Sequence, residues 1–320
     1  MGNLNVALLG PEGYGNDLGK KGTSSDISFY NLKKGNTTVT FIEPSRYPER
    51  LSSLFYSVSL AHRAVLVVDE INAVLGECIL MLDCIGLQKG VIVLRNYIPR
   101  EQVDPLIRGT VVERYEYVPD DHPVLRERFI SEALVLEEQS PAGGPCAIPV
   151  DHFYNVKGIG TVALGSVASG EVRRHDQLGI LPGKKTAQVR SIQRHDDDTE
   201  IATSGERVGL ALKGVDATEL DRGDVLTNDP RIASSGTISG RATLVKYWPG
   251  PLKGEMVLYI GHWMQFLSVR LAFVDNSGDW HRPSVTMKSD KDLVYLPGDR
   301  AVLHYLEGGK LRIVGTLILS

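Results

Sequence analysis

Hydrophobic residues in the first 140 positions follow two alternating patterns. Continuous apolar runs, such as Val65-Leu66-Val67-Val68 and Val91-Ile92-Val93-Leu94, are typical of strands buried on both faces of a sheet. Stretches with helical periodicity lie between these runs. The predicted strands are 4–9, 26–31, 37–42, 64–69, 90–95 and 111–117, and the predicted helices are 48–61, 72–85, 100–107 and 122–138. Strands that alternate with helices predict a mostly parallel sheet covered on both sides.

The pattern changes after residue 140. The segment Ser140-Pro141-Ala142-Gly143-Gly144-Pro145 combines prolines and glycines and is typical of a linker. Residues 146–230 and 237–320 consist of short β-type runs separated by glycine-containing turns, without convincing helical periodicity. Each of these blocks has the length of one small barrel. We therefore predict an α/β domain followed by two all-β barrels, with boundaries at 1–142, 143–232 and 233–320.

Composition restricts the function classes. The formal net charge of −4 gives no overall attraction to nucleic acid, so any RNA-binding surface must be local. The three cysteines form no C-x-x-C pair, which indicates a reducing cytosol rather than a disulfide framework or a thiolate metal site. No apolar run approaches the roughly 20 residues that span a membrane. We expect a cytoplasmic protein that does not associate with membranes.

The strand that ends at Gly10 leads into an incomplete phosphate-binding loop. Residues Gly10 and Gly15 have the glycine spacing of the G-x-x-x-x-G-K-[ST] motif, with a further glycine at Gly13. Asn16 and Asp17 follow, where the motif has a lysine for the phosphates and a hydroxyl for Mg²⁺. Two interpretations remain open at this point: a relic anion site built from backbone N–H groups, or a glycine-rich turn after a strand.

Two polar clusters resemble metal or catalytic sites but have simpler interpretations. Residues 195–198, His-Asp-Asp-Asp, are typical of a charged turn, which we favour over a metal site. In Asp120-Asp121-His122-Pro123, Asp121 is placed to cap a helix that has a proline in its first turn. We expect no metal site at either cluster.

The whole arrangement resembles the translational GTPases of the elongation factor Tu and SelB class. The resemblance is carried by five ordered motifs of the predicted second domain, at residues 145–152, 158–170, 189–193, 205–214 and 222–226. In the third domain, residues 256–261 and 297–303 are more similar to SelB than to Tu. The resemblance implies a SelB-like, three-domain protein whose first domain is a reduced P-loop GTPase-like domain.

The first domain departs from the family pattern at each chemical motif. Residues 21–26 resemble the R-G-[IT]-T-x-D motif, with Ser24 at the Mg²⁺-binding threonine, but too few residues precede them to form an ordinary helix. Arg46 replaces the water-positioning histidine, and Ile98 replaces the aspartate that reads guanine. We therefore expect weak guanine-nucleotide binding at most and no GTP hydrolysis above background. The candidate residues of a residual nucleotide or phosphate site are Gly10, Gly13, Gly15, Asn16, Lys21 and Ser24.

The resemblance also implies an RNA-binding role for the barrels. In the family the second barrel holds the 3′-terminal adenosine of aminoacyl-tRNA, and Gln193 stands where a glutamate touches the ribose. Glutamine can both donate and accept hydrogen bonds to a ribose or a base edge. The alternative is a set of ordinary polar residues on a barrel surface. The candidate RNA-binding residues are Arg190, Gln193, Arg194, His195, Arg282, Lys310 and Arg312.

Three functions are compatible with these features. The first is a monomeric elongation factor-like protein that binds a special aminoacyl-tRNA, such as a pyrrolysyl-tRNA, and works with the ribosome without an ordinary GTP cycle. Selenocysteine delivery is not expected, because no RNA-hairpin-binding domain follows the third barrel. The second is an unconventional but active GTPase, and the third is a protein-interaction scaffold. The retained second-barrel motifs favour the first.

Overall fold

The computed structural model describes residues 2–137, 143–194, 197–307 and 311–320. Contacts within the chain divide it into two compact units. One unit contains residues 1–138, 244–249 and 302–316, and the other contains residues 139–243, 250–301 and 317–320. The predicted domain boundaries stay a prediction.

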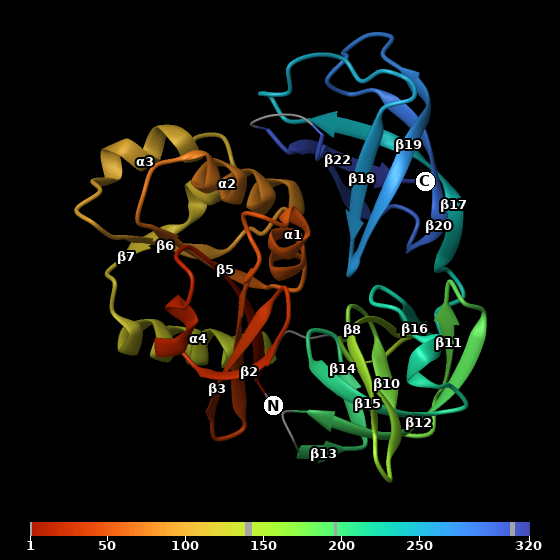
Figure 1. Ribbon diagram of the computed structural model, residues 1–320. Helices are drawn as coiled ribbons and strands as arrows, with labels where there is room; N and C mark the ends of the chain where they lie inside the picture. Colours follow the sequence, from red (N-terminus) through yellow and green to blue (C-terminus); the bar gives the residue numbers. More distant parts are fainter. Residues whose placement is uncertain (1, 138–142, 195–196, 308–310) are drawn as a thin grey trace. The chain divides into compact units, whose positions relative to one another are not determined.

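The N-terminal α/β domain is built on one mixed sheet with the strand order β2-β3-β4-β1-β5-β6-β7 (Figure 1). Strands β4, β1, β5, β6 and β7 run parallel to one another, while β2 and β3 add an antiparallel edge. This arrangement confirms the predicted mostly parallel sheet. The strands are β1 (Asn3–Leu9), β2 (Lys20–Ser24), β3 (Ser28–Lys34), β4 (Thr37–Glu43), β5 (Arg63–Val68), β6 (Gly90–Leu94) and β7 (Glu116–Val118).

Helices cover both faces of this sheet. Helix α4 lies on one face, where Leu125 and Phe129 pack with alternate residues of β1 such as Val6. Figure 1 shows α1 and α2 on the opposite face. As predicted, Asp121 caps α4, because its carboxylate accepts a hydrogen bond from the Val124 amide at 3.1 Å. The helices are α1 (Leu51–Ser59), α2 (Ala73–Ile85), α3 (Arg100–Ile107) and α4 (His122–Glu137), with short 3₁₀ turns η1 (Tyr14–Asp17) and η2 (Val111–Arg114).

The main differences from the predicted elements lie at two turns. The predicted strand 26–31 corresponds to β3, which begins at Ser28 and forms a hairpin with the unpredicted strand β2. The predicted strand 111–117 begins instead as η2, because the Thr110 hydroxyl accepts from the Val112 amide and caps the turn. Only Glu116–Val118 then pairs with β6. Cys78 and Cys84 are buried in α2.

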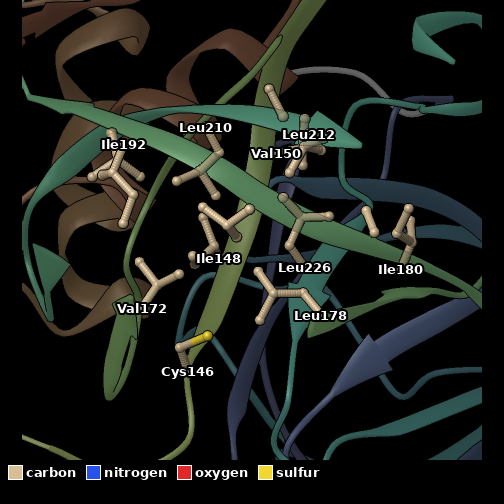
Figure 2. Close-up of a cluster of buried hydrophobic side chains, with 14 of the residues drawn as sticks. Cys146, Ile148, Val150, Val172, Leu178, Ile180, Ile192, Leu210, Leu212 and Leu226 are labelled. Atoms are coloured by element: carbon tan, nitrogen blue, oxygen red, sulfur yellow. The ribbon is translucent and has the colours of Figure 1, made fainter. Parts of the chain in front are cut away.

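The second domain is a barrel with the strand order β11-β16-β8-β9-β15-β12-β13, closed by pairing of β11 with β12. Inward-facing aliphatic side chains at every second position, such as Leu210 and Leu212, fill it (Figure 2). Its strands are β8 (Ala147–Val156), β9 (Gly160–Ser166), β10 (Glu171–Arg173), β11 (Gln177–Leu181), β12 (Lys185–Arg194), β13 (Asp197–Thr199), β14 (Ile201–Thr203), β15 (Arg207–Lys213) and β16 (Val225–Thr227).

The third domain is a closed barrel with the strand order β17-β20-β19-β18-β21-β22. Among the described residues from 143 onward, the only helical turn is η3 (Ala217–Glu219). The predicted fold class, an α/β domain followed by two all-β barrels, is therefore confirmed. The strands are β17 (Ala233–Leu244), β18 (Val257–His262), β19 (Gln265–Asp275), β20 (Ser284–Tyr295), β21 (Arg300–His304) and β22 (Ile313–Leu319). No helix in the part of the chain that the structure describes is long and apolar enough to cross a bilayer.

Candidate functional site

The loop after β1 binds a carboxylate of its own chain. The amide of Gly13 donates to Glu43 Oε1 at 2.8 Å, and the amide of Gly15 donates to Glu43 Oε2 at 3.2 Å. Glu43 is the last residue of β4, which runs parallel to β1, so both strands end at the same edge of the sheet. The Glu43 side chain is buried. Amides that converge in this way form an anion-binding nest, and here the anion is internal.

The glycines of this loop are also required by close packing. A Cβ atom on Gly15 would lie 2.5 Å from the ring of Tyr30, and one on Gly10 would lie 2.6 Å from Cβ of Val67. Tyr30 is buried, and its pKa is raised by this burial and by the nearby charge of Glu43. The glycine spacing therefore has a structural explanation that does not involve a nucleotide.

The remaining candidates for a nucleotide site make other contacts. The Asn16 side-chain amide donates to the Gly13 carbonyl at 2.9 Å. The ammonium of Lys21 lies 5.8 Å from the centroid of the Tyr30 ring. The Ser24 hydroxyl bonds to that of Ser28 at 2.7 Å. The structure thus brings Gly13 and Gly15 together around Glu43. The side chains of Asn16, Lys21 and Ser24 instead contact other residues of the same domain.

A second cluster beside the loop joins the ends of β1, β6 and β7. The Tyr14 hydroxyl donates to Asp120 at 2.6 Å, and Arg95 forms an ion pair with Asp120 at 3.1 Å. The Arg95 guanidinium lies 5.9 Å from the Tyr14 ring centroid, and His122 packs edge-on against the same ring. Burial and the bond to Asp120 raise the pKa of Tyr14 above its usual range. The sequence indicated Asp120 and His122 only as part of a helix start, and no sequence pattern connected them with Tyr14 or Arg95.

The second barrel carries an open polar pocket of about 550 Å³. Arg190 and Gln193, which were both predicted to bind RNA, line it together. Side chains that sequence reasoning missed complete the pocket, and no sequence signal connected them before the barrel was known. The lining residues are Gly158, Ile159, Arg174, His175, Gln188, Arg190, Ser191, Gln193, Asp198, Ala211 and Lys213.

A β-bulge in β12 gathers the polar side chains on the pocket side. Val189 pairs with Leu212 and Ser191 with Ala211, so Arg190 is an extra residue in the ladder. Val189 and Ile192 both remain in the barrel core. The inserted residue allows Arg190 and Ser191 to line the pocket in succession, which a regular alternation of faces does not allow.

Hydrogen bonds fix the guanidinium groups at the pocket wall. Arg190 donates to the Ile159 carbonyl at 3.0 Å, and Arg174 donates to the Arg190 carbonyl at 3.0 Å. The side-chain amide of Gln193 donates to Asp198 at 3.0 Å. The side chain of Lys213 is exposed and forms no hydrogen bond or ion pair with any described residue. The pocket therefore presents several positive groups, the side-chain amides of Gln188 and Gln193 and the carboxylate of Asp198 to a polar ligand.

The other RNA-binding candidates lie elsewhere. Arg194 bonds to Glu206 and to Thr199, and it does not line the pocket. Arg312 is held by Glu77, with Nε to Oε1 at 2.8 Å. Arg282 is exposed in the segment before β20. His195 and Lys310 lie outside the described residues.

The described residues contain no group of three or more His, Cys, Asp or Glu side chains that could hold a metal ion. The three cysteines are buried and form no disulfide. The guanidinium, ammonium and amide groups that line the second-barrel pocket are able to hydrogen-bond a polar, anionic ligand.

Comparison with known proteins places these features in context. Residues 160–227 match the family model of elongation factor Tu domain 2. The uncharacterized protein MJ0325 of Methanocaldococcus jannaschii is 43% identical over 229 residues, which cover 71% of this chain and 73% of that protein. The selenocysteine-specific elongation factor of the same organism is 25% identical over 228 residues, covering 66% of this chain and 49% of that protein, so the chain spans about half the length of this relative.

A solved structure shows the same fold. SelB from Methanococcus maripaludis, in complex with the GTP analogue GppNHp, superposes with a TM-score of 0.82 over 100% of this chain and 79% of its own. Its sequence identity is 20%, so this likeness concerns the fold alone.

Proposed function

Because this chain belongs to the translational GTPase class of elongation factor Tu and SelB, we propose that it is an elongation factor-like protein that binds the 3′ end of an aminoacyl-tRNA in its second-barrel pocket. It does so as a cytoplasmic monomer, in partnership with the ribosome and without a GTP cycle. The tRNA is a special one, such as a pyrrolysyl-tRNA.

The observation that carries the proposal is the convergence of Arg190 and Gln193 in one open pocket. The pocket volume of about 550 Å³ lies within the range of small-ligand sites. Guanidinium groups at Arg174 and Arg190 suit phosphate oxygens, since their fixed fork of donors matches that geometry. The amide of Gln193 can meet a ribose hydroxyl or a base edge. A terminal nucleotide combines all of these acceptors and donors.

The absence of a GTP cycle is proposed from the first-domain loop. Glu43 uses the amides of Gly13 and Gly15 that a phosphate would need. Tyr30 packs against Gly15, and Ile98 offers no acceptor to a guanine base. Guanine nucleotide is therefore bound weakly or not at all, and hydrolysis stays at background.

A salt titration of tRNA binding by gel shift tests the pocket. Arg190→Ala should lower affinity and reduce the slope of log K against log salt by about 1, because one phosphate contact is lost. Gln193→Ala should cost about 0.5–1.5 kcal/mol of binding free energy if it removes one net hydrogen bond. Arg173→Ala is the matched control, since Arg173 is an exposed arginine of the same barrel that does not line the pocket.

Each alternative function has its own outcome in this design. If no charged or uncharged tRNA binds at low salt, the interaction-scaffold function replaces the proposal. If Arg173→Ala and Arg190→Ala weaken binding equally, the RNA contacts the barrel but not the pocket. GTP turnover that disappears in a Gly15 variant would support the unconventional GTPase.

A further inference from the structure

We infer that the loop at residues 10–15 is an oxyanion-binding site whose resident ligand is the carboxylate of Glu43. The two oxygens of this carboxylate each accept a separate backbone amide, from Gly13 at 2.8 Å and from Gly15 at 3.2 Å. One bidentate carboxylate thus takes both donors. This inference goes beyond the proposed function and stands whether or not the second barrel binds tRNA.

The burial of Glu43 supports the inference that the amides of Gly13 and Gly15 bind an oxyanion. The residue is 4% exposed, and no lysine, arginine or histidine among the described residues forms an ion pair with it. A buried carboxylate is costly unless hydrogen bonds compensate its charge. The amides of Gly13 and Gly15 provide that compensation, which is the same interaction that a nest offers to phosphate.

The geometry of the sheet keeps this ligand in place. Glu43 pairs with Ser28 of β3 at the end of the β4 ladder, and β4 runs parallel to β1 along the register that ends in the loop. Strand pairing therefore holds the carboxylate beside the loop, where it has the high effective concentration of an intramolecular ligand. Tyr30 packs against Gly15 beside it and occupies further space. A free phosphate and Glu43 exclude one another, because both require the same two amides.

Removal of the carboxylate should create a site for small free oxyanions. We expect Glu43→Ala to have a lower melting temperature than the unsubstituted protein. Acetate or inorganic phosphate should then raise this melting temperature in a saturable manner, because a ligand that binds only the folded state stabilises it. Sodium chloride at the same ionic strength corrects for general salt effects.

Glu12→Gln is the matched control. Glu12 lies in the same loop and is exposed, and it forms no hydrogen bond or ion pair with a described residue, so its substitution removes the same charge without opening the nest. The unsubstituted protein and Glu12→Gln should show no oxyanion-specific stabilisation. In amide NMR spectra, acetate should shift the resonances of Gly13 and Gly15 in Glu43→Ala only.

Two results would overturn the inference. The first is an equal response of the unsubstituted protein and Glu43→Ala to acetate, phosphate and GDP. The second is unchanged hydrogen exchange at the Gly13 and Gly15 amides in Glu43→Gln. This variant keeps the side-chain shape but turns one acceptor into a donor. If Glu43→Ala does not fold, this variant decides, because faster hydrogen exchange at Gly13 or Gly15 supports the inference and unchanged exchange at both contradicts it.

Discussion

The family motifs predict a ligand both at the loop after β1 and at the pocket of the second barrel. In the structure the loop amides are occupied by the chain itself, whereas the pocket is open. In the loop, the amides of Gly13 and Gly15 are already bound by Glu43, and Tyr30 fills adjacent space. In the pocket, Arg190 and Lys213 project into an open volume. A motif can thus persist because packing needs it, while ligand binding requires donors that the fold leaves available.

The largest expected difference is in GTP affinity, between a loop whose motif is restored while Glu43 remains and an ordinary nucleotide site. Asn16→Lys with Asp17→Ser restores the sequence G-x-x-x-x-G-K-S, but it leaves Glu43 on the amides of Gly13 and Gly15. We expect the Kd for GTP to stay above about 1 mM, at least about 4 kcal/mol weaker than a micromolar site. Calorimetry with GTP measures this. Adding Glu43→Ala to the pair is the informative comparison, and micromolar binding by the pair without it would show that the loop is open after all.

The next effect separates a structural arginine from a pocket arginine on β12. Arg194→Ala leaves Glu206 buried without its cationic partner, and we expect a loss of about 3 kcal/mol in unfolding free energy. Arg190→Ala removes an exposed side chain and should change stability by less than about 0.5 kcal/mol while weakening RNA binding. Denaturant unfolding measures both. Equal losses of stability would contradict the division between the two residues.

A smaller effect tests the packing explanation of the glycines. Gly15→Ala would place a methyl group 2.5 Å from the Tyr30 ring, and we expect destabilisation of about 2 kcal/mol from overpacking. Gly76→Ala in α2 is the control, since a Cβ there meets nothing within 4 Å and alanine favours a helix by about 0.8–1 kcal/mol. Thermal unfolding compares the two. A neutral Gly15→Ala would mean that the glycine is not kept for packing.

Local pattern was sufficient to predict much of the fold. Continuous apolar runs predicted β5 and β6 closely, and periodicity predicted α3 at its observed bounds of Arg100–Ile107. The hairpin of β2 and β3 was missed because β2 is exposed along its whole length and has no hydrophobic alternation. The turn η2 was missed because its β-branched residues resemble a strand, whereas a cap at Thr110 decides the conformation.

The candidate sites were less predictable because they depend on sheet register. Glu43 lies 28 residues from Gly15 in sequence, and only the parallel pairing of β4 with β1 brings them together. In the pocket, Arg190 and Gln193 belong to a recognisable motif, but Arg174 and Lys213 meet them only after the barrel closes. No pattern within one strand carries that information.

A ligand that is part of the polypeptide cannot be diluted, exchanged or depleted. The Glu43 carboxylate that fills the loop after β1 is synthesised with the chain, at a fixed ratio of one per molecule. Under the inference drawn above, the occupancy of this loop is set at translation and is independent of the ratio of GTP to GDP in the cell.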